Sequence, residues 1–247
     1  MIQRKVEMVK LNDIKGLIFD YGGTIDTNSR HWAEVLWEHY VKYNVPVSKE
    51  QFREAYVYGE RKLAREPLIC PEHNFADVLF IKVKIQITYL TEAGFLQKNE
   101  VEEKNYISSI ASGCYQYVLN VLKRTRPVLD KLSHSYKMVL VSNFYGNIQT
   151  ILKDFSLDTF FSSVIESSVV GVRKPDPAIY QMGVDALNLP ASQILVIGDS
   201  FSKDVVPAKK VGCKVVWLKG EGWGNEEIDE SLPDLKITDL PDLLSYV

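Results

Sequence analysis

The chain has 247 residues, of which 46% are hydrophobic and 25% are charged, a composition typical of globular proteins and unlike disordered or fibrous chains. Its 29 basic and 32 acidic residues give a net charge of −3, which supplies no broad positive field, so we expect no nucleic-acid partner. The sequence lacks an apolar leader and any run of about 18 apolar residues, so we expect no membrane insertion and a cytoplasmic location.

The first predicted element is a strand at residues 16–20, Gly-Leu-Ile-Phe-Asp. This short apolar run is followed at once by Tyr-Gly-Gly-Thr at residues 21–24, which favour a tight turn. A continuous apolar run of this length is typical of a strand buried on both faces of a parallel sheet. Asp20 is therefore expected at the carboxyl end of a buried strand.

Residues 28–124 show a different pattern, because apolar side chains recur there at helical spacing and strand signals are scarce. A stripe of this kind begins at Trp32. Ser48 is placed to cap a helix that runs through Arg65, and Gln51 stands at the position that completes a capping box. We predict that this region is an inserted all-helical cap domain.

One stretch of the insertion is ambiguous. Apolar and polar residues alternate over residues 81–89, which taken alone indicates a strand. Residues 75–90 also carry a good helical stripe, and a lone strand in a helical domain would have no partner. We therefore predict a helix.

After the insertion, strands and helices alternate again. The predicted strands are residues 136–141, 194–197 and 214–218, and the predicted helices are residues 147–154, 177–187 and 205–211. This alternation predicts an α/β fold with a Rossmann-like parallel sheet core flanked by helices. We assign residues 1–27 and 125–247 to this core domain and residues 28–124 to the cap. The acidic stretch at residues 221–242 is expected to be a solvated surface.

Polar side chains follow the ends of the predicted strands. They are Asp20 and Thr24 after the first strand, Ser142 and Asn143 after the second, and Asp199 and Asp204 after the third. Lys174 adds a cation between the second and third of these pairs in the sequence. In open parallel sheets, ligands bind beyond the carboxyl ends of the strands. Carboxylates suit a hard cation, whereas hydroxyls and a lysine suit anionic oxygens. The set predicts phosphoryl-transfer chemistry.

Four short motifs resemble those of the haloacid dehalogenase-like (HAD) hydrolase superfamily, and they occur in the same order. They are Phe-Asp-Tyr-Gly-Gly-Thr-Ile-Asp at residues 19–26, Ser142-Asn143, Lys174-Pro175-Asp176-Pro177, and Gly198-Asp199-Ser200 with Asp204. The resemblance covers nearly the whole chain. The helical insertion between the first two motifs is similar to the cap that some members of the superfamily carry.

The resemblance implies a role for each of these residues. Asp20 would be the nucleophile that forms an aspartyl-phosphate intermediate, and Lys174 would offset the repulsion between Asp20 and the phosphate. Ser142 would bind oxygens of the transferred group and belongs to the catalytic set. Thr24, Ser142, Asn143 and Lys174 would contact the substrate, which we expect to be a small phosphorylated metabolite.

A metal site is implied as well. Mg²⁺ would be bound by the carboxylates of Asp20 and Asp199 and by the backbone carbonyl of Gly22. Asp204 would bind the metal or hold its water ligands. Oxygen ligands of this kind are the ones that Mg²⁺ prefers.

Gly22 departs from the pattern of many phosphatases in the superfamily, which carry a second Asp there as general acid and base. Loss of such a group typically lowers a rate by about 10² to 10⁴. Either the substrate has a leaving group that needs little protonation, such as an acyl or aryl phosphate, or a cap residue such as His31, His39 or Glu60 supplies the proton.

Three other functions remain open. Phosphonate hydrolases of the superfamily also lack the second Asp and use a cap lysine, for which Lys62, Lys82 and Lys84 are candidates. Dehalogenases need no leaving-group proton, but they also need no metal, so Asp199 and Asp204 disfavour them. A non-catalytic binding protein is the third alternative. We predict a Mg²⁺-dependent phosphatase; the sequence does not indicate an oligomeric state.

Overall fold

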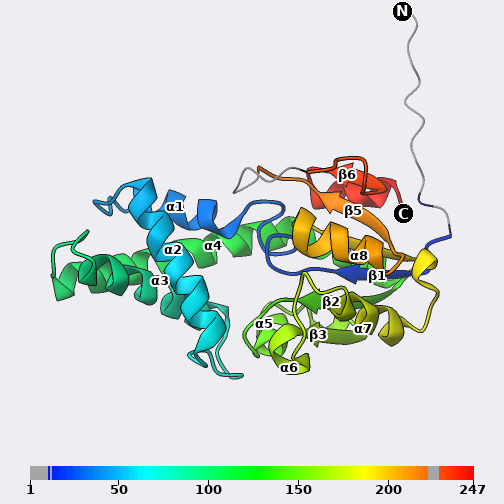
Figure 1. The fold of residues 1–247 in the computed structure, drawn as a ribbon, viewed down its shortest axis with the longest axis horizontal. Helices are drawn as coiled ribbons and strands as arrows, with labels where there is room; N and C mark the ends of the chain where they lie inside the picture. The colour runs from blue at the N-terminus through cyan, green and yellow to red at the C-terminus, as the bar shows by residue number, and fades with distance from the viewer. Residues whose placement is uncertain (1–10, 12, 222–227) are drawn as a thin grey trace, which may run out of the picture.

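The computed structural model describes residue 11, residues 13–221 and residues 228–247. Within these residues, six parallel strands form one sheet in the order β3-β2-β1-β4-β5-β6 (Figure 1). The strands are β1 (Gly16–Phe19), β2 (Lys137–Ser142), β3 (Ser163–Glu166), β4 (Ile194–Gly198), β5 (Lys214–Leu218) and β6 (Leu235–Ile237). β1 lies between β2 and β4 and runs parallel to both, so the loops that follow these three strands lie side by side.

The segment between β1 and β2 is helical. Its helices are α1 (Trp32–Lys42), α2 (Lys49–Arg65), α3 (Phe75–Glu92) and α4 (Glu100–Ser133). The rest of the chain adds α5 (Ile148–Asp154), α6 (Ser167–Val170), α7 (Ala178–Leu187) and α8 (Val206–Lys210), with the short turns η1 (Asp158–Phe160), η2 (Ala191–Gln193), η3 (Phe201–Val205) and η4 (Leu240–Ser245). None of the helices in the described residues has a stretch long and apolar enough to cross a membrane.

Helices cover both faces of the sheet. Successive residues of a strand point to opposite faces, so each strand contributes side chains to two cores. Ile18 of β1 belongs to a core formed with α7 and α8. Leu17 and Phe19, its neighbours in β1, belong to the other core, which includes side chains of α4, α5 and η4. That second core continues into the apolar interior of α1, α2 and α3, so the insertion is joined to one face of the sheet.

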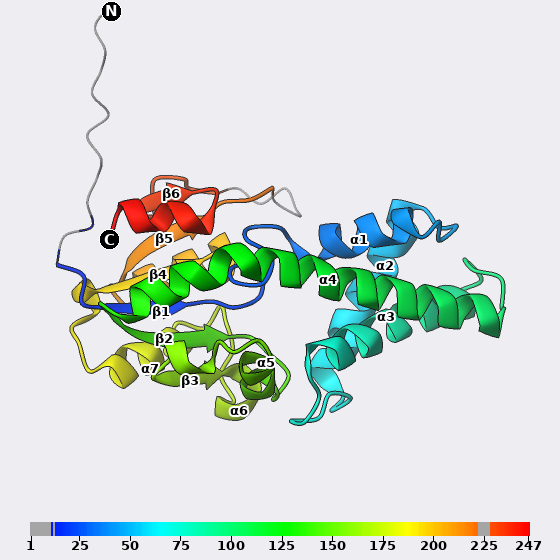
Figure 2. The same ribbon diagram turned by 180° about the vertical axis from the view of Figure 1, so that it is seen from behind.

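The cap and the sheet share one helix. Figure 2 shows α4 passing along the sheet and continuing into the helical insertion. The predicted boundary between residues 124 and 125 falls inside this helix. At that point the fully buried hydroxyl of Thr125 donates to the carbonyl of Ile25 at 3.0 Å, which fixes α4 against the turn that follows β1.

A second contact between cap and core lies at the loop between α2 and α3. The Thr150 hydroxyl of α5 donates to the carbonyl of Pro71 at 2.6 Å. The amide of Asn147 donates to the carbonyl of His73 at 2.8 Å. These bonds attach the loop to the start of α5, which follows β2 in the chain.

Most of the predicted elements are present. The four predicted strands correspond to β1, β2, β4 and β5, and the ambiguous stretch is the helix α3. The capping box of α2 forms as expected, with the Ser48 hydroxyl accepting from the amide of Gln51 and the Gln51 side chain accepting from the amide of Ser48.

The sequence analysis missed β3 and β6. The prediction of a solvated surface at residues 221–242 is wrong for its last part, because β6 and η4 form there and bury Ile237 and Leu240. Residues 222–227 of that stretch lie outside the described residues. A three-residue strand at the edge of a sheet is too short to produce a periodic signal.

The contact between α4 and the turn after β1 can be tested with Thr125→Val. This change keeps the side-chain shape but leaves the buried Ile25 carbonyl without its donor, so we expect a loss of about 1–3 kcal/mol in the free energy of unfolding. Urea denaturation measures this loss. Ser133→Ala is the control, because its hydroxyl also donates to a backbone carbonyl of α4 but is exposed, so the change should be within about 0.5 kcal/mol.

Candidate active site

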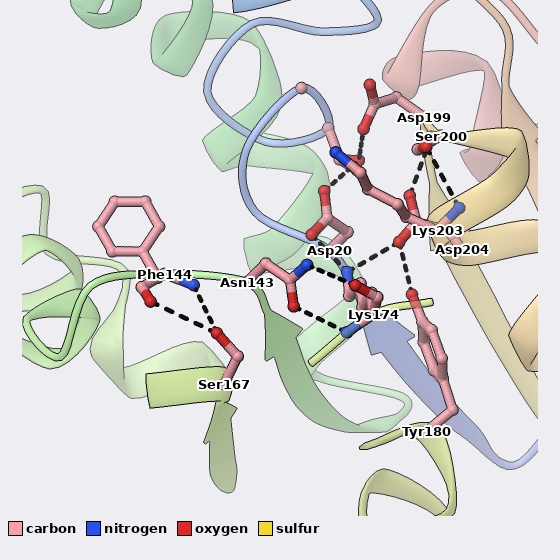
Figure 3. A network of polar contacts seen from close by, with 12 residues as sticks. Asp20, Asn143, Phe144, Ser167, Lys174, Tyr180, Asp199, Ser200, Lys203 and Asp204 are labelled. Atoms are coloured by element: carbon pink, nitrogen blue, oxygen red, sulfur yellow. Dashed lines mark hydrogen bonds and ion pairs between the residues drawn. The ribbon is translucent and has the colours of Figure 1, made fainter. Parts of the chain in front are cut away.

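The candidate site lies where the chain leaves β1, β2 and β4. A cavity of about 920 Å³ opens there between the sheet and the cap. Among the residues predicted for the site, those that line the cavity are Asp20, Gly22, Ser142, Asn143, Lys174, Asp199 and Asp204. Thr24 is fully buried beside them. The parallel sheet thus brings together residues that are up to 184 positions apart in the sequence (Figure 3).

Lys174 forms the centre of the site. Its ammonium group lies 2.6 Å from Asp20 Oδ1 and 2.8 Å from Asp204 Oδ1, and all three residues are buried (Figure 3). Burial works against the charge of Lys174, but the carboxylates of Asp20 and Asp204 outweigh it and raise the pKa of the ammonium above its ordinary value. The lysine is therefore a cation at neutral pH.

Asp204 has its oxygens engaged by protein donors. The Tyr180 hydroxyl donates to Oδ1 at 2.7 Å, and the backbone amide of Ser200 donates to Oδ2 at 2.9 Å. With Lys174, these contacts give the carboxylate three donors. Asp204 is thus fixed in place to orient Lys174. Tyr180 was not singled out by the sequence analysis, because a tyrosine on the apolar side of a helix normally indicates only a core position.

Thr24 joins the first motif to the fourth. Its hydroxyl lies 3.1 Å from Asp20 Oδ2 and 3.2 Å from Asp199 Oδ1. The turn beside it approaches Asp199 closely, since a Cβ added to Gly23 would lie 2.3 Å from Asp199 Oδ2. Gly23 also has a φ of +96°, which L side chains rarely adopt. A glycine is therefore required for this approach.

The acidic groups of the site fit a divalent cation. Carboxylate oxygens of Asp20, Asp199 and Asp204 all lie within 4.8 Å of one another. Burial raises the pKa of Asp20 to about 6 although Lys174 opposes the shift, and burial together with the charges of Asp20 and Asp204 raises the pKa of Asp199 well above its ordinary value. One lysine does not balance three carboxylates. Clustered oxygen ligands with excess negative charge are the environment that Mg²⁺ occupies in proteins.

Asn143 holds the third motif against the second. Its side-chain amide donates to the carbonyl of Lys174 at 3.0 Å, and its side-chain oxygen accepts from the amide of Lys174 at 2.9 Å. Both ends of the Asn143 side chain thus position the backbone that carries the lysine. Contact between Asn143 and a substrate stays a prediction, as does the metal-binding role of the Gly22 carbonyl.

The loop after Asn143 is held by two residues that the sequence analysis missed. The Ser167 hydroxyl accepts from the amide of Phe144 at 3.2 Å (Figure 3). The buried carboxylate of Glu166 accepts from the amides of Gly146 and Ile148 at 2.5 and 3.4 Å. Glu166 is the last residue of β3 and Ser167 follows it; because β3 was not predicted, no pattern in the sequence pointed to them.

Asp26, the last residue of the first motif, lies at the junction between the turn after β1 and the cap. It is fully buried, and it accepts from the amide of Gly23 at 2.7 Å and from Trp32 Nε1 at 2.9 Å. Burial raises its pKa to about 7, and the two hydrogen bonds oppose that shift. Asp26 therefore links the turn after β1 to the first helix of the cap.

A family model for haloacid dehalogenase-like hydrolases matches residues 14–212. The chain belongs to this family. The match includes all four motifs and the helical insertion, so the resemblance that the motifs indicated is confirmed, together with the α/β fold.

Relatives of this HAD-like hydrolase include phosphatases. A glyceraldehyde 3-phosphate phosphatase of Pyrococcus abyssi is 38% identical over 120 residues, which are 48% of this chain and 50% of the relative. A phosphoglycolate phosphatase of Pectobacterium atrosepticum is 26% identical over 244 residues, 97% of this chain and 95% of the relative. Among the relatives with at least 30% identity, the chain spans about half of their length or less.

Solved structures share the fold. The HAD hydrolase YfnB of Bacillus subtilis, solved bound to magnesium, superposes with a TM-score of 0.59 at 17% identity and covers 94% of this chain and 97% of its own. Identity at this level shows the common architecture of the HAD-like hydrolases.

The position of Asp26 predicts a specific dependence of stability on pH. Its pKa is about 7 in the folded chain and 3.8 in the unfolded chain, so between these values the folded state binds more protons and stability falls as pH rises. Asp26→Asn removes this contribution, which is at most about 1.4 kcal/mol per pH unit. We expect urea denaturation in EDTA from pH 4 to 7 to give a flatter slope for the variant. The same slope in both proteins would contradict the assignment, and exposed Asp185→Asn is the control.

Proposed function

We propose that this HAD-like hydrolase is a Mg²⁺-dependent phosphatase that acts on a small phosphorylated metabolite through an aspartyl-phosphate on Asp20. The observation that carries the proposal is the contact of Asp20 with Lys174 at the floor of the cavity, next to Asp199 and Asp204. This arrangement offers a fixed carboxylate nucleophile, a cation for the phosphate and an acidic cluster for a metal. The phosphatase relatives support the same reaction.

In the proposed reaction, an oxygen of Asp20 forms a bond to phosphorus as the bond between phosphorus and the ester oxygen breaks. The leaving group departs with the bonding electron pair and takes a proton from solvent water, and a water molecule then hydrolyses the aspartyl-phosphate to release phosphate and regenerate Asp20. Lys174 remains a cation throughout and offsets the charge that gathers on the phosphoryl oxygens. Ser142, which lines the cavity at the end of β2, would donate a hydrogen bond to one of these oxygens.

The proposed ligands of Mg²⁺ are the carboxylates of Asp20 and Asp199 and the carbonyl of Gly22. Asp204, whose oxygens already accept three hydrogen bonds from the protein, would act from further out by holding water. Bound Mg²⁺ would neutralise negative charge on the phosphoryl oxygens.

The candidates for the leaving-group proton differ in their positions. His39 packs inside the cap, with Nδ1 on the carbonyl of Val35 at 2.8 Å, and is not among the residues that line the cavity. His31 lines the cavity, but burial and the nearby Lys203 lower its pKa to about 4, so it is neutral at physiological pH. Glu60 also lines the cavity. None of these arrangements replaces an Asp at position 22, so we expect the hydrolysis of alkyl phosphates to be slow.

The arrangement of the cap disfavours the phosphonate alternative. Lys84 is exposed, and Lys62 pairs with Glu66 at the surface. Lys82 lines the cavity, but its pKa is raised well above the ordinary value, because its neighbours outweigh the effect of burial. A lysine that forms a Schiff base needs a lowered pKa instead. The acidic cluster likewise disfavours a dehalogenase that works without metal.

The proposal is tested by hydrolysis of p-nitrophenyl phosphate, whose phenolate leaves with little need of a proton. We expect turnover with Mg²⁺, loss of turnover in EDTA, and a fall of at least about a thousandfold for Asp20→Asn, because the nucleophile is removed. Asp185→Asn, an exposed change on α7, is the control and should retain full activity. A wild-type protein that binds Mg²⁺ by calorimetry and does not turn over would overturn the phosphatase assignment.

The role of position 22 is tested with Gly22→Asp. There is room for the side chain, since the nearest atom to an added Cβ is Asp26 Oδ2 at 4.0 Å. We expect kcat for an alkyl phosphate to rise by about 10² to 10⁴, with little change for p-nitrophenyl phosphate, because only the alkoxide needs an acid. Gly22→Asn has the same size and no proton to give, so an equal gain in that variant would contradict the explanation.

A further inference from the structure

A second polar cluster lies where the cap faces the core. Lys82 of α3 lies 2.8 Å from Glu60 of α2. The hydroxyl of Tyr145, in the loop after β2, donates to the other carboxylate oxygen of Glu60 at 3.3 Å. All three side chains line the same cavity as Asp20 and Lys174. We call Glu60, Lys82 and Tyr145 the cap triad.

Burial and neighbouring groups set the protonation states of Lys82 and Tyr145. Burial disfavours the charge of Lys82, but Glu60 and the hydroxyls of Tyr145 and Tyr56 outweigh it, so the pKa is raised. Burial and the charge of Glu60 raise the pKa of Tyr145 to about 12. At neutral pH, Lys82 is a cation and Tyr145 a neutral hydroxyl. The Glu60 and Lys82 charges then cancel.

Stability alone is a poor reason for this cluster. Replacing a buried ion pair by well-packed apolar residues is often neutral or stabilising, because taking both charges out of water is expensive. Nearby positions of the same wall are apolar or aromatic, including Trp32, Leu79 and Phe75. A charged pair within such a wall is therefore explained better by what it contacts in the cavity.

Glu60 is the more exposed member of the pair. Its side chain is 34% exposed, against 9% for Lys82, and both residues line the cavity. A molecule in the cavity would thus meet a carboxylate that accepts hydrogen bonds. Hydroxyl groups can donate to it while the ion pair stays intact, whereas a second carboxylate placed there would be repelled, and like charges brought together cost several kcal/mol.

The cap triad is also close to the phosphate end of the site. Tyr145 comes three residues after Ser142, so their Cα atoms are at most about 11 Å apart. The cap triad thus lines the same cavity as Ser142 and Lys174, so a short substrate with its phosphate at these two residues would contact both ends of the site.

We propose that the cap triad is the leaving-group subsite and selects short phosphate esters of neutral, hydroxyl-bearing alcohols over esters that carry a carboxylate. This inference rests on the proposed phosphatase function and adds the chemical class of the substrate. Glu60 accepts from the hydroxyls of the leaving group, and Lys82 holds Glu60 in place.

The test compares glycerol 3-phosphate with 3-phosphoglycerate, which have the same length and differ by a hydroxymethyl group against a carboxylate. We expect wild-type kcat/KM to favour glycerol 3-phosphate by at least about tenfold. Glu60→Gln removes the negative charge and leaves Lys82 as an uncompensated cation, so the preference should fall by about tenfold or more, mainly through a lower KM for 3-phosphoglycerate. Glu38→Gln is the control, because it removes a carboxylate from an exposed ion pair of the cap that lies outside the cavity lining.

Lys82→Met should change the preference between the two esters in the opposite direction. It leaves Glu60 unpaired, so the preference for glycerol 3-phosphate should increase. A purely structural role of the pair would not move the two variants in opposite directions. Thermal unfolding and circular dichroism identify any variant that does not fold. The other variant still shows whether the preference between the two esters moves in the predicted direction.

The outcomes separate the two levels of the argument. If the wild-type protein hydrolyses neither p-nitrophenyl phosphate nor the two esters, the proposed function fails. If it hydrolyses p-nitrophenyl phosphate but shows no preference between the esters, or if Glu60→Gln leaves the preference unchanged, the phosphatase assignment stands and the cap triad is not the subsite.

Discussion

The contact of one buried lysine with two buried carboxylates organises this molecule. Lys174 contacts both Asp20 and Asp204, so one buried cation compensates two buried carboxylates that would otherwise repel each other. Removing one partner would leave a charge stranded in a low-dielectric interior. The surrounding contacts serve this arrangement, since Asn143 fixes the backbone of Lys174 and Tyr180 fixes the carboxylate of Asp204. The order of the strands β2, β1 and β4 is what makes the contact possible.

The sequence was sufficient for the parts of the fold that have a strong local signal. Continuous apolar runs predicted β1, β2, β4 and β5, and the argument that a lone strand lacks a partner correctly gave α3. The sequence was insufficient where an element is too short to show a pattern, or where a feature depends on residues from several parts of the chain. β3 is only half buried and β6 has three residues. Glu60, Lys82 and Tyr145 could each be read from the sequence, but their proximity depends on how the cap closes on the core, which no local pattern encodes.

Charge density explains why the first motif looks as it does here. The cavity floor already holds three carboxylates and one compensating lysine. A fourth acid, Asp26, is kept out of solvent by Gly23 and Trp32, and its raised pKa leaves it partly protonated at neutral pH. With glycine at position 22, the side of the turn nearest to Asp26 carries no further charge. Asp26, a second carboxyl group of the motif, thus has a structural role through its contacts with Gly23 and Trp32.

The continuity of α4 limits how a substrate can enter. Two segments join the cap to the core: residues 27–31, in which Asn28 and Ser29 have positive φ angles, and a helix that continues without interruption from Glu100 to Ser133. A cap tethered by two loops could move without deforming any helix. Here a movement of the cap relative to the sheet would also have to bend α4 or displace it. Pro127, which lacks the amide hydrogen that would bond to the preceding turn, marks the position where flexing disturbs the fewest hydrogen bonds.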